Sequence, residues 1–590
     1  MPSDKYLEIY SDSFPYIFMK HKDIPLKTYD ISILRYDIYL PKDGAPLAVK
    51  DIPSLRLTAL VRGSVQNSPR EFFRILTYCA DRKDVPYKIF SPKSWIQLSH
   101  AMTSDHSSWE TPDPGYWTSQ GYIIIRGDDC GAGQSPGELD TMSRGSSEAF
   151  FDVVEWCVDQ EWSSRKVGLL GISYYDGTKW RVAARRQKGL AAIIPWEGMS
   201  DYHRDRVRHG DILSDKFIKF WWENAVEKNQ YGKPGRAAQG WGFDTLDGDL
   251  DEATLIANRR NQMEDTEKHR YLDEEYFSSR NFDVQDIEVP LLSVANWGGI
   301  LLHLRGNVLG WMRASSQHKF LHFIVGRHDL PFYYDHSAKL QKSFLDAFLK
   351  GDDYDGWKTG HQPRVRLTLR QGDCGVDDPL RELSFPTRGE DDWPLPDTRY
   401  TKFFLTAENE LSETAKDVKR VFSYDALSGE PLQFRYTADT TVELTGDVLA
   451  NLSVSIDRKD ENVPRDMDLF LALRKLAKDG SEVFYTVTIG DPVPLVEGWH
   501  RVSLYCASDV QEVKAGVIYE VEVEIWPTKV VLEDRETLVL EVAGHDAQGA
   551  GIFSHSDSED QKTKHMDGAN NVHVGNKDSW LLLPTIPDRR

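Results

Sequence analysis

A serine between a strand and a helix is the strongest candidate nucleophile in the chain. Ser173 lies in the run GISYY (residues 171–175), after the apolar segment KVGLL and before the helical pattern TKWRVAARRQ. A serine on such a tight turn projects its hydroxyl above the sheet, and the backbone N–H of the next residue, Tyr174, points to the same space as an oxyanion donor. Because Gly-x-Ser alone occurs by chance in a chain of this length, the signal is the strand–turn–helix context. A serine that only caps the turn is the alternative.

A serine hydroxyl becomes a nucleophile when a base takes its proton, so the chain should hold a histidine after a later strand. His328 follows the apolar run HKFLHFIVG and lies in the loop GRHDLP, before a helical pattern. We interpret it as the base; a loop histidine with only structural partners is the alternative. The other histidines considered are His203, His209, His303 and His336, which lie in helical patterns and are interpreted as surface or cap residues. No pair of histidines has the spacing of metal ligands.

The carboxylate that would orient this imidazole is out of its usual place. In the order serine, acid, histidine, the acid follows the strand before the histidine strand, but VPLLSVANW ends in Gly298-Gly299. Glu197, after the strand GLAAIIPW, is the nearest carboxylate at a strand end, and geometry rather than chain order decides whether it can serve. The alternative is that Glu197 pairs with an arginine of the following segment, Arg204 or Arg206. Asp329, beside the histidine, is the weaker acid candidate because its backbone position points it elsewhere.

A glycine-rich run, RGDDCGAGQSPG (residues 126–137), follows the strand GYIII. Its two aspartates would repel a phosphate, no Gly-Lys-Ser/Thr follows, and the spacing is not that of a dinucleotide fingerprint. We therefore reject nucleotide binding and interpret the run as a tight loop that borders the mouth of an active site. No feature of the sequence implies a cofactor.

Apolar runs and helical patterns alternate from about residue 30 to 370, which predicts a mostly parallel sheet covered on both faces. The expected strands are GYIIIRGD, KVGLLGIS, GLAAIIPW, VPLLSVANW and HKFLHFIVG, with helices such as SSEAFFDVVEWCVDQ and HSAKLQKSFLDAFLKG between them. The polar and aromatic stretch of residues 201–286 interrupts this alternation. It has helical periodicity, which indicates an inserted helical cap. Further on, segments such as TTVELTGDVLANLSVSID and YEVEVEIWPTKVVL alternate apolar and polar residues, as in an antiparallel jelly roll.

Five segments follow from this change of pattern. Residues 1–200 and 287–371 are the two parts of the α/β core, 201–286 the helical cap, 372–399 a proline-bearing linker, and 400–590 the C-terminal jelly-roll β-sandwich. We find no internal repeat of 20 to 50 residues, which excludes solenoids and propellers.

Composition and charge restrict the class of protein and of partner. The 590 residues are 40% hydrophobic and 28% charged, as in folded globular proteins. The 71 Lys and Arg against 93 Asp and Glu give a net charge of −22, which disfavours nucleic acids and anionic membranes as partners. No window approaches the ~18 apolar residues of a membrane span, and the N-terminus lacks a signal-peptide pattern. We therefore expect a cytoplasmic protein. The five cysteines are spread without a CxxC pair, so we expect neither a disulfide frame nor a zinc site.

Taken together, the motifs resemble the CocE/NonD hydrolases, which include cocaine esterase, X-prolyl dipeptidyl peptidases and α-amino acid ester hydrolases. The likeness covers nearly the whole chain. It rests on ETPDPGYW (110–117), the loop 128–137, GISYY with Trp180, NWGG (296–299), GRH (326–328) with Phe332-Tyr333, and LPTIP (583–587). The resemblance implies an α/β-hydrolase core with an inserted helical cap and a C-terminal jelly roll, with Ser173 as nucleophile and His328 as base.

The sequence departs from the family pattern at four places. Gly298 stands where cocaine esterase-like members have the acid of a Trp-Tyr-Asp-Gly run. In YCADRK, Asp81 stands where those members place an oxyanion-hole tyrosine, and a carboxylate there is unfavourable unless protonated or turned away. Asp176 occupies a position where relatives tend to have a small residue, and the segment 45–73 is longer than the family needs.

The leading interpretation is a serine hydrolase that cleaves an ester or amide through an acyl-enzyme. Its substrates would be small esters, amides or short peptides, and X-Pro dipeptidyl-peptidase-like or acyl amino acid ester hydrolase activity is what the resemblance implies. The departures at Asp81 and Gly298 leave an alternative, a degenerate hydrolase fold that binds a ligand or partner without turnover. A carbohydrate-binding role for the jelly roll is a third hypothesis, which the missing secretion signal disfavours. The sequence leaves the substrate and a homo-oligomer open.

Overall fold

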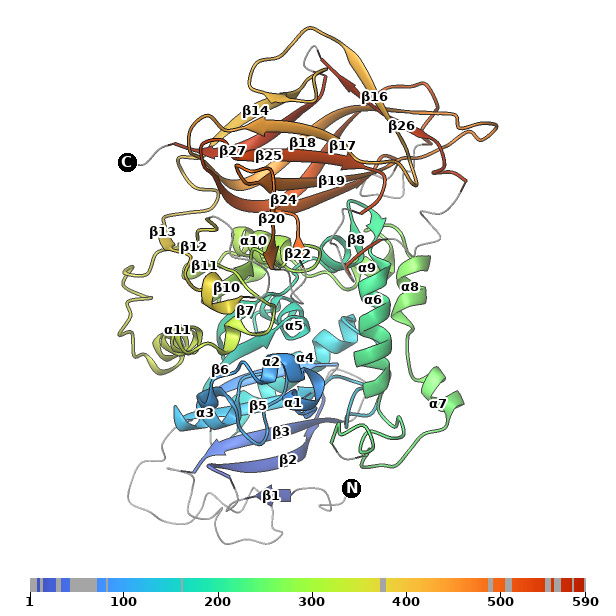
Figure 1. Cartoon of the computed structure of the whole chain (residues 1–590). Helices are drawn as coiled ribbons and strands as arrows, with labels where there is room; N and C mark the ends of the chain where they lie inside the picture. Colours follow the sequence, from blue (N-terminus) through green and yellow to red (C-terminus); the bar gives the residue numbers. More distant parts are fainter. Residues whose placement is uncertain are drawn as a thin grey trace.

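The structure, a computed structural model, describes most of the chain. The described residues are 8–10, 14–27, 33–42, 72–80, 83–160, 163–242, 244–371, 378–486, 492–503, 512–546, 553–555, 564–575 and 578–587. Most of the expected long segment 45–73 and Asp81 lie outside these ranges. Two large sheets are stacked along the molecule, the N-terminal one at the bottom of Figure 1 and the C-terminal one at the top.

The N-terminal sheet is parallel at its centre and antiparallel at its edges. In the described ranges it has 11 strands in the order β1-β2-β3-β5-β4-β6-β7-β10-β11-β12-β13. Neighbours from β5 to β12 in this order run parallel, whereas β1 to β3 and β13 pair antiparallel. The strands are β1 Glu8–Tyr10, β2 Tyr16–Pro25, β3 Ile33–Pro41, β4 Phe72–Cys79, β5 Tyr122–Asp128, β6 Ser163–Ile172, β7 Leu190–Trp196, β10 Leu291–Asn296, β11 Lys319–Ile324, β12 Val365–Thr368 and β13 Thr387–Glu390.

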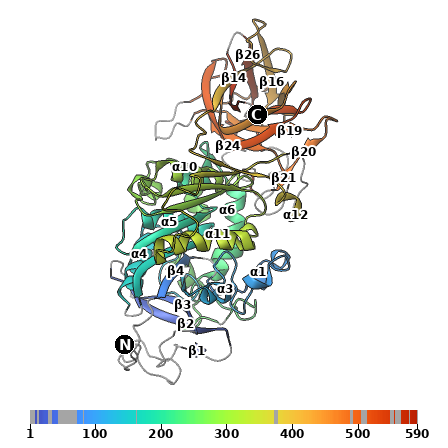
Figure 2. The ribbon, with the colours of Figure 1, turned by 90° about the vertical axis from the view of Figure 1, so that its left-hand side faces the viewer.

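Helices pack around this sheet, and the views in Figures 1 and 2 place them on both sides of it. Because both faces are covered, β5 and β10 are buried along their whole length. The helices of this part are α1 Tyr87–Phe90, α2 Pro92–Trp95, η4 His100–Met102, α3 Pro114–Ser119, α4 Arg144–Asp159, α5 Tyr174–Ala183, α10 Leu304–Arg313, η9 Pro331–Tyr333, α11 Asp335–Leu345, η10 Asp346–Lys350 and α12 Pro379–Glu382. The predicted α/β class is confirmed, with the five expected strands and the expected helices in place.

The regular elements described between β7 and β10 are short helices, as the periodicity predicted, and one short hairpin. Its helices run along one side of the sheet, on the right of Figure 1. The elements are η5 His203–Val207, β8 Arg208–His209, β9 Ile212–Leu213, α6 Asp215–Trp221, η6 Trp222–Val226, η7 Glu227–Asn229, α7 Glu252–Ala257, α8 Gln262–Lys268, α9 Glu275–Ser278 and η8 Val284–Asp286. The two-residue strands of the hairpin are too short to give an alternating pattern in the sequence.

The C-terminal sheet is antiparallel throughout the described residues. It has 12 strands, with β18 paired to β24, β26 and β27 at its centre. The strands are β14 Arg399–Leu405, β15 Leu411–Ser412, β16 Arg420–Asp425, β17 Leu432–Thr437, β18 Val442–Asp457, β19 Asp468–Leu476, β20 Glu482–Val483, β23 Val496–Arg501, β24 Tyr519–Leu532, β25 Thr537–Ala543, β26 Ala569–Val574 and β27 Trp580–Ile586, with the separate pair β21 Tyr485–Thr486 and β22 Pro492–Val493. The change from one sheet to the other falls between β13 and β14, inside the segment expected to be a linker.

The cap and the C-terminal sheet meet in a close backbone contact. The N–H of Arg501 donates to the carbonyl oxygen of Gly210 over 2.8 Å. Gly210 has φ +52°, and a Cβ built on it would lie 1.8 Å from the carbonyl oxygen of Trp499. Only glycine therefore fits this position, because a side chain would meet backbone that cannot swing aside.

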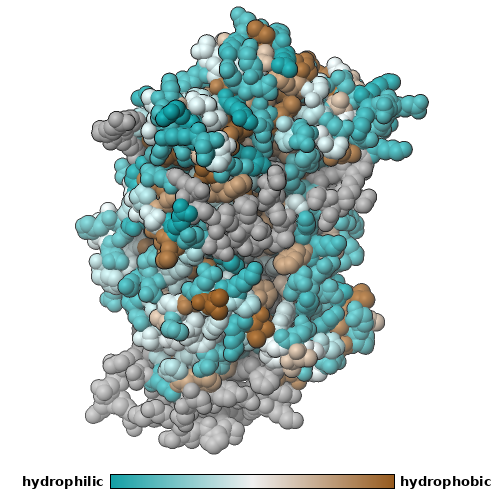
Figure 3. Space-filling view, viewed as in Figure 1, coloured by the Kyte–Doolittle hydropathy of each residue, from teal (hydrophilic) through white to brown (hydrophobic). Residues whose placement is uncertain are grey.

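Hydrophobic side chains on the face shown in Figure 3 form small separate groups in a mostly hydrophilic surface. Among the described residues, the large apolar side chains with the greatest exposure are those of Ile96, directly after α2, and Leu380, in α12. A single exposed apolar residue is normal for a folded domain and indicates no partner by itself.

Gly210→Ala should weaken the docking of the C-terminal sheet. The new Cβ adds a steric clash, worth about 1–3 kcal/mol, to the ~1–2 kcal/mol cost of a left-handed alanine. Gly235→Ala is the matched control, since Gly235 also has positive φ (+88°) but a Cβ added to it would have nothing within 4 Å. Thermal unfolding should show a melting temperature several degrees lower for Gly210→Ala than for Gly235→Ala. Equal melting temperatures would contradict this account of the contact.

Candidate active site

Ser173 occupies a strained turn between β6 and α5. Its backbone has φ +62° and ψ −116°, a region that a residue with a side chain rarely adopts. The N–H of Ser173 donates to the carbonyl oxygen of Glu197 over 3.0 Å, which ties this turn to the end of the neighbouring strand β7. Tyr174 is the first residue of α5, so its N–H has no partner within the helix. The strand–turn–helix arrangement expected around Ser173 is present.

His328 and Glu197 lie together at the same edge of the sheet. Nδ1 of His328, in the loop after β11, is 3.0 Å from Oε2 of Glu197, in the loop after β7. The other carboxylate oxygen of Glu197 accepts a hydrogen bond of 2.9 Å from Nδ2 of Asn296, the last residue of β10. Both Glu197 and His328 are almost completely buried. The structure thus brings the proposed acid and base together and holds the acid by a second bond.

The alternative partners considered for these residues are engaged elsewhere. Arg204 lies 3.9 Å from Asp201, and Arg206 stacks over the ring of Trp221. Asp329 accepts hydrogen bonds from Tyr87 and Trp109. None of the described side-chain bonds of Asp329 reaches the imidazole of the preceding histidine.

A second carboxylate contacts His328 from the opposite side. Oε1 of Glu110, in the loop before α3, is 2.9 Å from Nε2 of His328. Glu110 is 2% exposed, has φ +62°, and its carbonyl oxygen accepts a hydrogen bond of 3.2 Å from the N–H of Ile172. The loop of Glu110 is therefore attached to the residue that precedes Ser173. Sequence reasoning used Glu110 only as part of a family motif and gave it no role.

His303 is not a surface or cap residue, contrary to the sequence prediction. It is fully buried at the start of α10, and its Nε2 lies 3.4 Å from the hydroxyl of Ser173. Its ring stacks on that of His328, with 5.0 Å between centroids and 12° between planes. The helical pattern placed His303 correctly beside α10, but periodicity alone does not say which face of a short helix meets the neighbouring loops. His203 and His209 lie in the cap segment and are also buried.

The two histidines of this cluster differ in charge. A carboxylate can only accept, so both ring nitrogens of His328 must donate, and the ring is an imidazolium. Burial alone would lower the pKa of His328, but the charge of Glu197 and the hydrogen bonds that the ring donates to Glu110 and Glu197 raise it to about 10. Burial, followed by the charges of His328 and Arg206, lowers the pKa of His303 well below its usual value. His303 is therefore neutral beside a charged neighbour.

Comparison with known proteins identifies the family. The family model of X-Pro dipeptidyl-peptidase (S15 family) matches residues 76–329, and that of the X-Pro dipeptidyl-peptidase C-terminal non-catalytic domain matches residues 354–583. Cocaine esterase from Rhodococcus sp. (strain MB1 Bresler) is 23% identical over 566 residues, which cover 82% of this chain and 92% of the esterase. The crystal structure of a CocE/NonD family hydrolase from Staphylococcus aureus superposes with a TM-score of 0.76 at 25% identity, over 97% of this chain and 94% of that one.

The chain belongs to the CocE/NonD family of hydrolases. As a family member it is a serine hydrolase, and the α/β-hydrolase core with an all-β C-terminal domain is confirmed. The structure of an α-amino acid ester hydrolase, 12% identical with a TM-score of 0.66, covers 98% of this chain and shares the fold.

The departure from other CocE/NonD proteins at Asp176 has a structural explanation. Asp176 is fully buried and pairs with Lys179 in the same helix. The ammonium group of Lys179 also donates to the carbonyl oxygens of Gly171 (3.1 Å) and Ile194 (3.3 Å). The pair therefore ties α5 to β6 and β7 beneath Ser173. Burial lowers the pKa of Lys179 to about 8 in spite of this partner.

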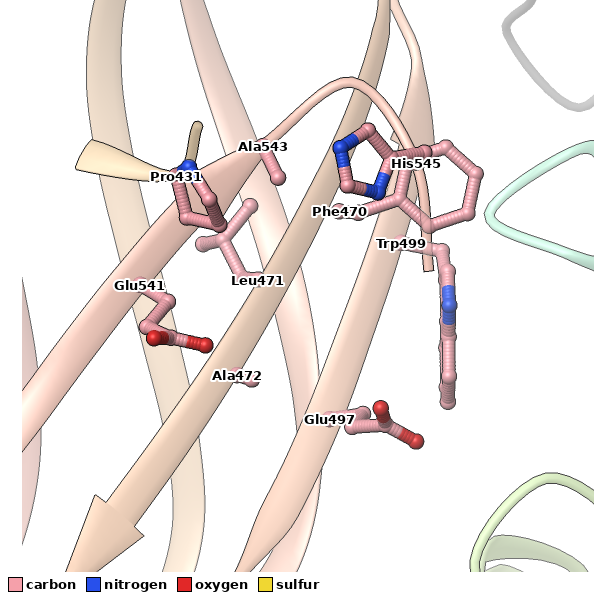
Figure 4. Close-up of a pocket in the computed structure, with 9 residues that line it drawn as sticks. All are labelled: Pro431, Phe470, Leu471, Ala472, Glu497, Trp499, Glu541, Ala543 and His545. Carbon is pink, nitrogen blue, oxygen red and sulfur yellow. The ribbon is translucent and has the colours of Figure 1, made fainter. Parts of the chain in front are cut away.

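The cavity of Figure 4 does not belong to this cluster. It lies in the C-terminal domain, where Glu497, Glu541 and His545 line it together with apolar side chains. Its volume is about 10 Å³, which is room for about one water molecule.

In the ranges that the structure describes, no helix has the length and apolar character to cross a membrane.

His328→Gln in this CocE/NonD protein should destabilise the chain in a pH-dependent way. A histidine with a raised folded pKa stabilises fully below its unfolded pKa of about 6.5, and the stabilisation is lost as the pH rises through about 10. The melting temperature of His328→Gln should therefore lie several degrees below that of the wild type at pH 6.5, with the gap shrinking towards pH 10.5. Exposed His100, changed to Gln, is the control and should show no such trend. A constant gap for His328→Gln would contradict the charged ring.

Proposed function

We propose that this CocE/NonD hydrolase cleaves an ester or amide with Ser173 as the nucleophile, His328 as the base and Glu197 as the orienting acid. The observation that carries the proposal is the placement of all three after the carboxyl ends of β6, β7 and β11, at one edge of the sheet, with Ser173 held in a left-handed turn and Glu197 bonded to Nδ1 of His328. Serine, acid and base follow in the usual chain order, but the acid lies in the loop after β7 instead of the loop after β10.

His328 is a better candidate for the base than His303, although His303 is the histidine bonded to Ser173. A base must hold the proton that it takes, and Glu197 stabilises the imidazolium of His328 through Nδ1. Nδ1 of His303 has no hydrogen-bond partner among the described residues, and a second positive ring would face that of His328. His303 instead holds the hydroxyl of Ser173 in place.

The proposed reaction has two halves. The reaction starts once His328 has given its Nε2 proton to solvent. The hydroxyl oxygen of Ser173 then attacks the substrate carbonyl while its proton passes to the freed Nε2 of His328, and the N–H of Tyr174 donates to the developing oxyanion. The bond to the leaving group then breaks, and His328 returns the proton to that group. A water molecule, deprotonated by the same ring, attacks the acyl-enzyme, releases the acid and restores Ser173.

The relatives indicate which acyl groups to test first. The matching family models are named for X-Pro dipeptidyl peptidases, and a similar chain is a cocaine esterase. We propose small esters, amides and short peptides as substrates, with X-Pro amides and esters of acyl amino acids as the initial panel. The match of residues 354–583 to a non-catalytic domain supports a site built from the N-terminal sheet and its cap.

A fluorophosphonate probe tests the proposed nucleophile directly. The protein should be labelled stoichiometrically at pH 8 to 10, with the modified peptide containing Ser173, and Ser173→Ala should abolish labelling. His328→Ala should slow it by about 10²–10⁴-fold, the usual contribution of a general base. His336→Ala, an exposed histidine in α11, is the control and should label like the wild type. A folded protein that shows no labelling at any pH, or labelling at another residue, would overturn the proposal.

A further inference from the structure

Nε2 of His328 is the nitrogen that must face the nucleophile, and in this structure it faces Glu110. We propose that Glu110 is a positioning residue that competes with Ser173 for Nε2 of His328, so that hydrolysis begins only after the bond between Glu110 and His328 is broken. This inference rests on the proposed roles of Ser173 and His328. It assigns a function to a residue of the ETPDPGYW motif that the catalytic scheme does not use.

The geometry leaves His328 no free nitrogen. Nδ1 is bonded to Glu197 over 3.0 Å and Nε2 to Glu110 over 2.9 Å. Meanwhile the hydroxyl of Ser173 contacts His303, whose ring lies against the face of His328. The nucleophile and its base are thus each held by a different partner, and the two must exchange partners before a proton can pass between them.

The backbone fixes Glu110 in this competing position. Its left-handed conformation and the bond from Ile172 to its carbonyl oxygen hold the loop beside the nucleophile turn. Its side chain is buried, so water does not compete for the carboxylate. The indole of Trp109, one residue earlier, packs edge-on against the ring of His328. The loop therefore contacts the imidazole through the indole of Trp109 as well as at Nε2.

The charges around His328 favour the bond to Glu110 at neutral pH. Glu197 faces the ring from the loop after β7 and Glu110 from the loop before α3, while neutral His303 covers one face. Asp176 in α5 also interacts electrostatically with the ring, but it is paired with Lys179. Asp329, the next residue in the chain, is bonded to Tyr87 and Trp109, and Arg206 acts on His303.

Loss of the ring proton would reverse this preference. When His328 gives up its Nε2 proton to solvent, the nitrogen lone pair faces the lone pairs of the Glu110 carboxylate, and the bond becomes repulsive. The same lone pair can then accept the hydroxyl proton of Ser173. The rate of the reaction should therefore rise with pH until His328 is neutral, around pH 10, and removing the charge of Glu110 should move this rise to lower pH.

The test compares the pH dependence of fluorophosphonate labelling at Ser173 in the wild type, Glu110→Gln and Glu110→Gly. Gln keeps the size of the side chain without its charge, and Gly suits the left-handed backbone, so at least one variant should fold. Asp329→Asn is the matched control, because it removes a neighbouring buried carboxylate that is not bonded to the ring. Second-order labelling rates are measured from pH 6 to 10.5 on proteins with a cooperative melt.

In both Glu110 variants the labelling rate should rise at a lower pH than in the wild type. For each pH unit of this shift, labelling at pH 7.5 should be about tenfold faster than in the wild type. At pH 10.5 the rates of the variants and of the wild type should agree within about threefold. Asp329→Asn should keep the wild-type profile. Labelling of folded Glu110 variants that is slower at every pH, or unchanged in profile, would overturn the role of Glu110 and leave the proposed nucleophile intact. Equal shifts in Asp329→Asn would also overturn it, since any nearby charge would then suffice. If the wild type is never labelled, the proposed function itself fails.

Discussion

The imidazolium of His328 between two buried carboxylates is the constraint on which the rest of the site depends. A buried charge is costly unless its hydrogen bonds are satisfied, and here both ring nitrogens have a carboxylate partner. The three groups come from loops after β11, after β7 and before α3, so the charge joins three separate parts of the core. Removing either carboxylate would leave a poorly paired charge in the interior, which explains why loops so far apart in sequence have to meet here.

The parallel sheet makes this meeting possible. The carboxyl ends of β6, β7, β10 and β11 lie at one edge, where ligands of open α/β sheets bind. Asn296, at the end of β10, has no charge to offer His328, and its amide instead donates to Glu197 and to the carbonyl oxygen of Gly326. The proposed acid, Glu197, thus lies two strands from the proposed base, and an amide on the strand between them holds it in place.

The sequence was informative where the signal is local. Apolar runs located the central strands, and the turn before α5 located Ser173, because each depends on neighbouring residues only. Glu197 could also be predicted from the sequence, since a carboxylate that directly follows a buried parallel strand must lie at the carboxyl edge of the sheet. These predictions required only that parallel strands end at the same edge of a sheet.

Glu110 and His303 could not be found in this way. The position of Glu110 depends on a left-handed backbone in an irregular loop, for which a glutamate gives no signal. His303 begins a helix whose sequence has the expected periodicity, but the contact with Ser173 depends on how that helix packs. Both residues are placed by tertiary structure, and neither type nor spacing distinguishes them from the other glutamates and histidines of an acidic chain.

The packing of α10 links the C-terminal domain to the position of His303. Two residues after His303, the guanidinium of Arg305 bonds to Glu524 of β24 at 2.9 Å and to Asp205 of the cap at 2.8 Å. Asp205 in turn accepts the N–H groups of Ser200 and Asp201, in the loop that follows Glu197. One buried cation therefore connects the C-terminal sheet, the cap and the start of the helix that carries His303. The C-terminal domain, whose matching family model is named non-catalytic, can in this way fix the orientation of a ring that contacts Ser173, the proposed nucleophile. A short helix anchored at Arg305 cannot rotate without breaking bonds to both of its neighbours.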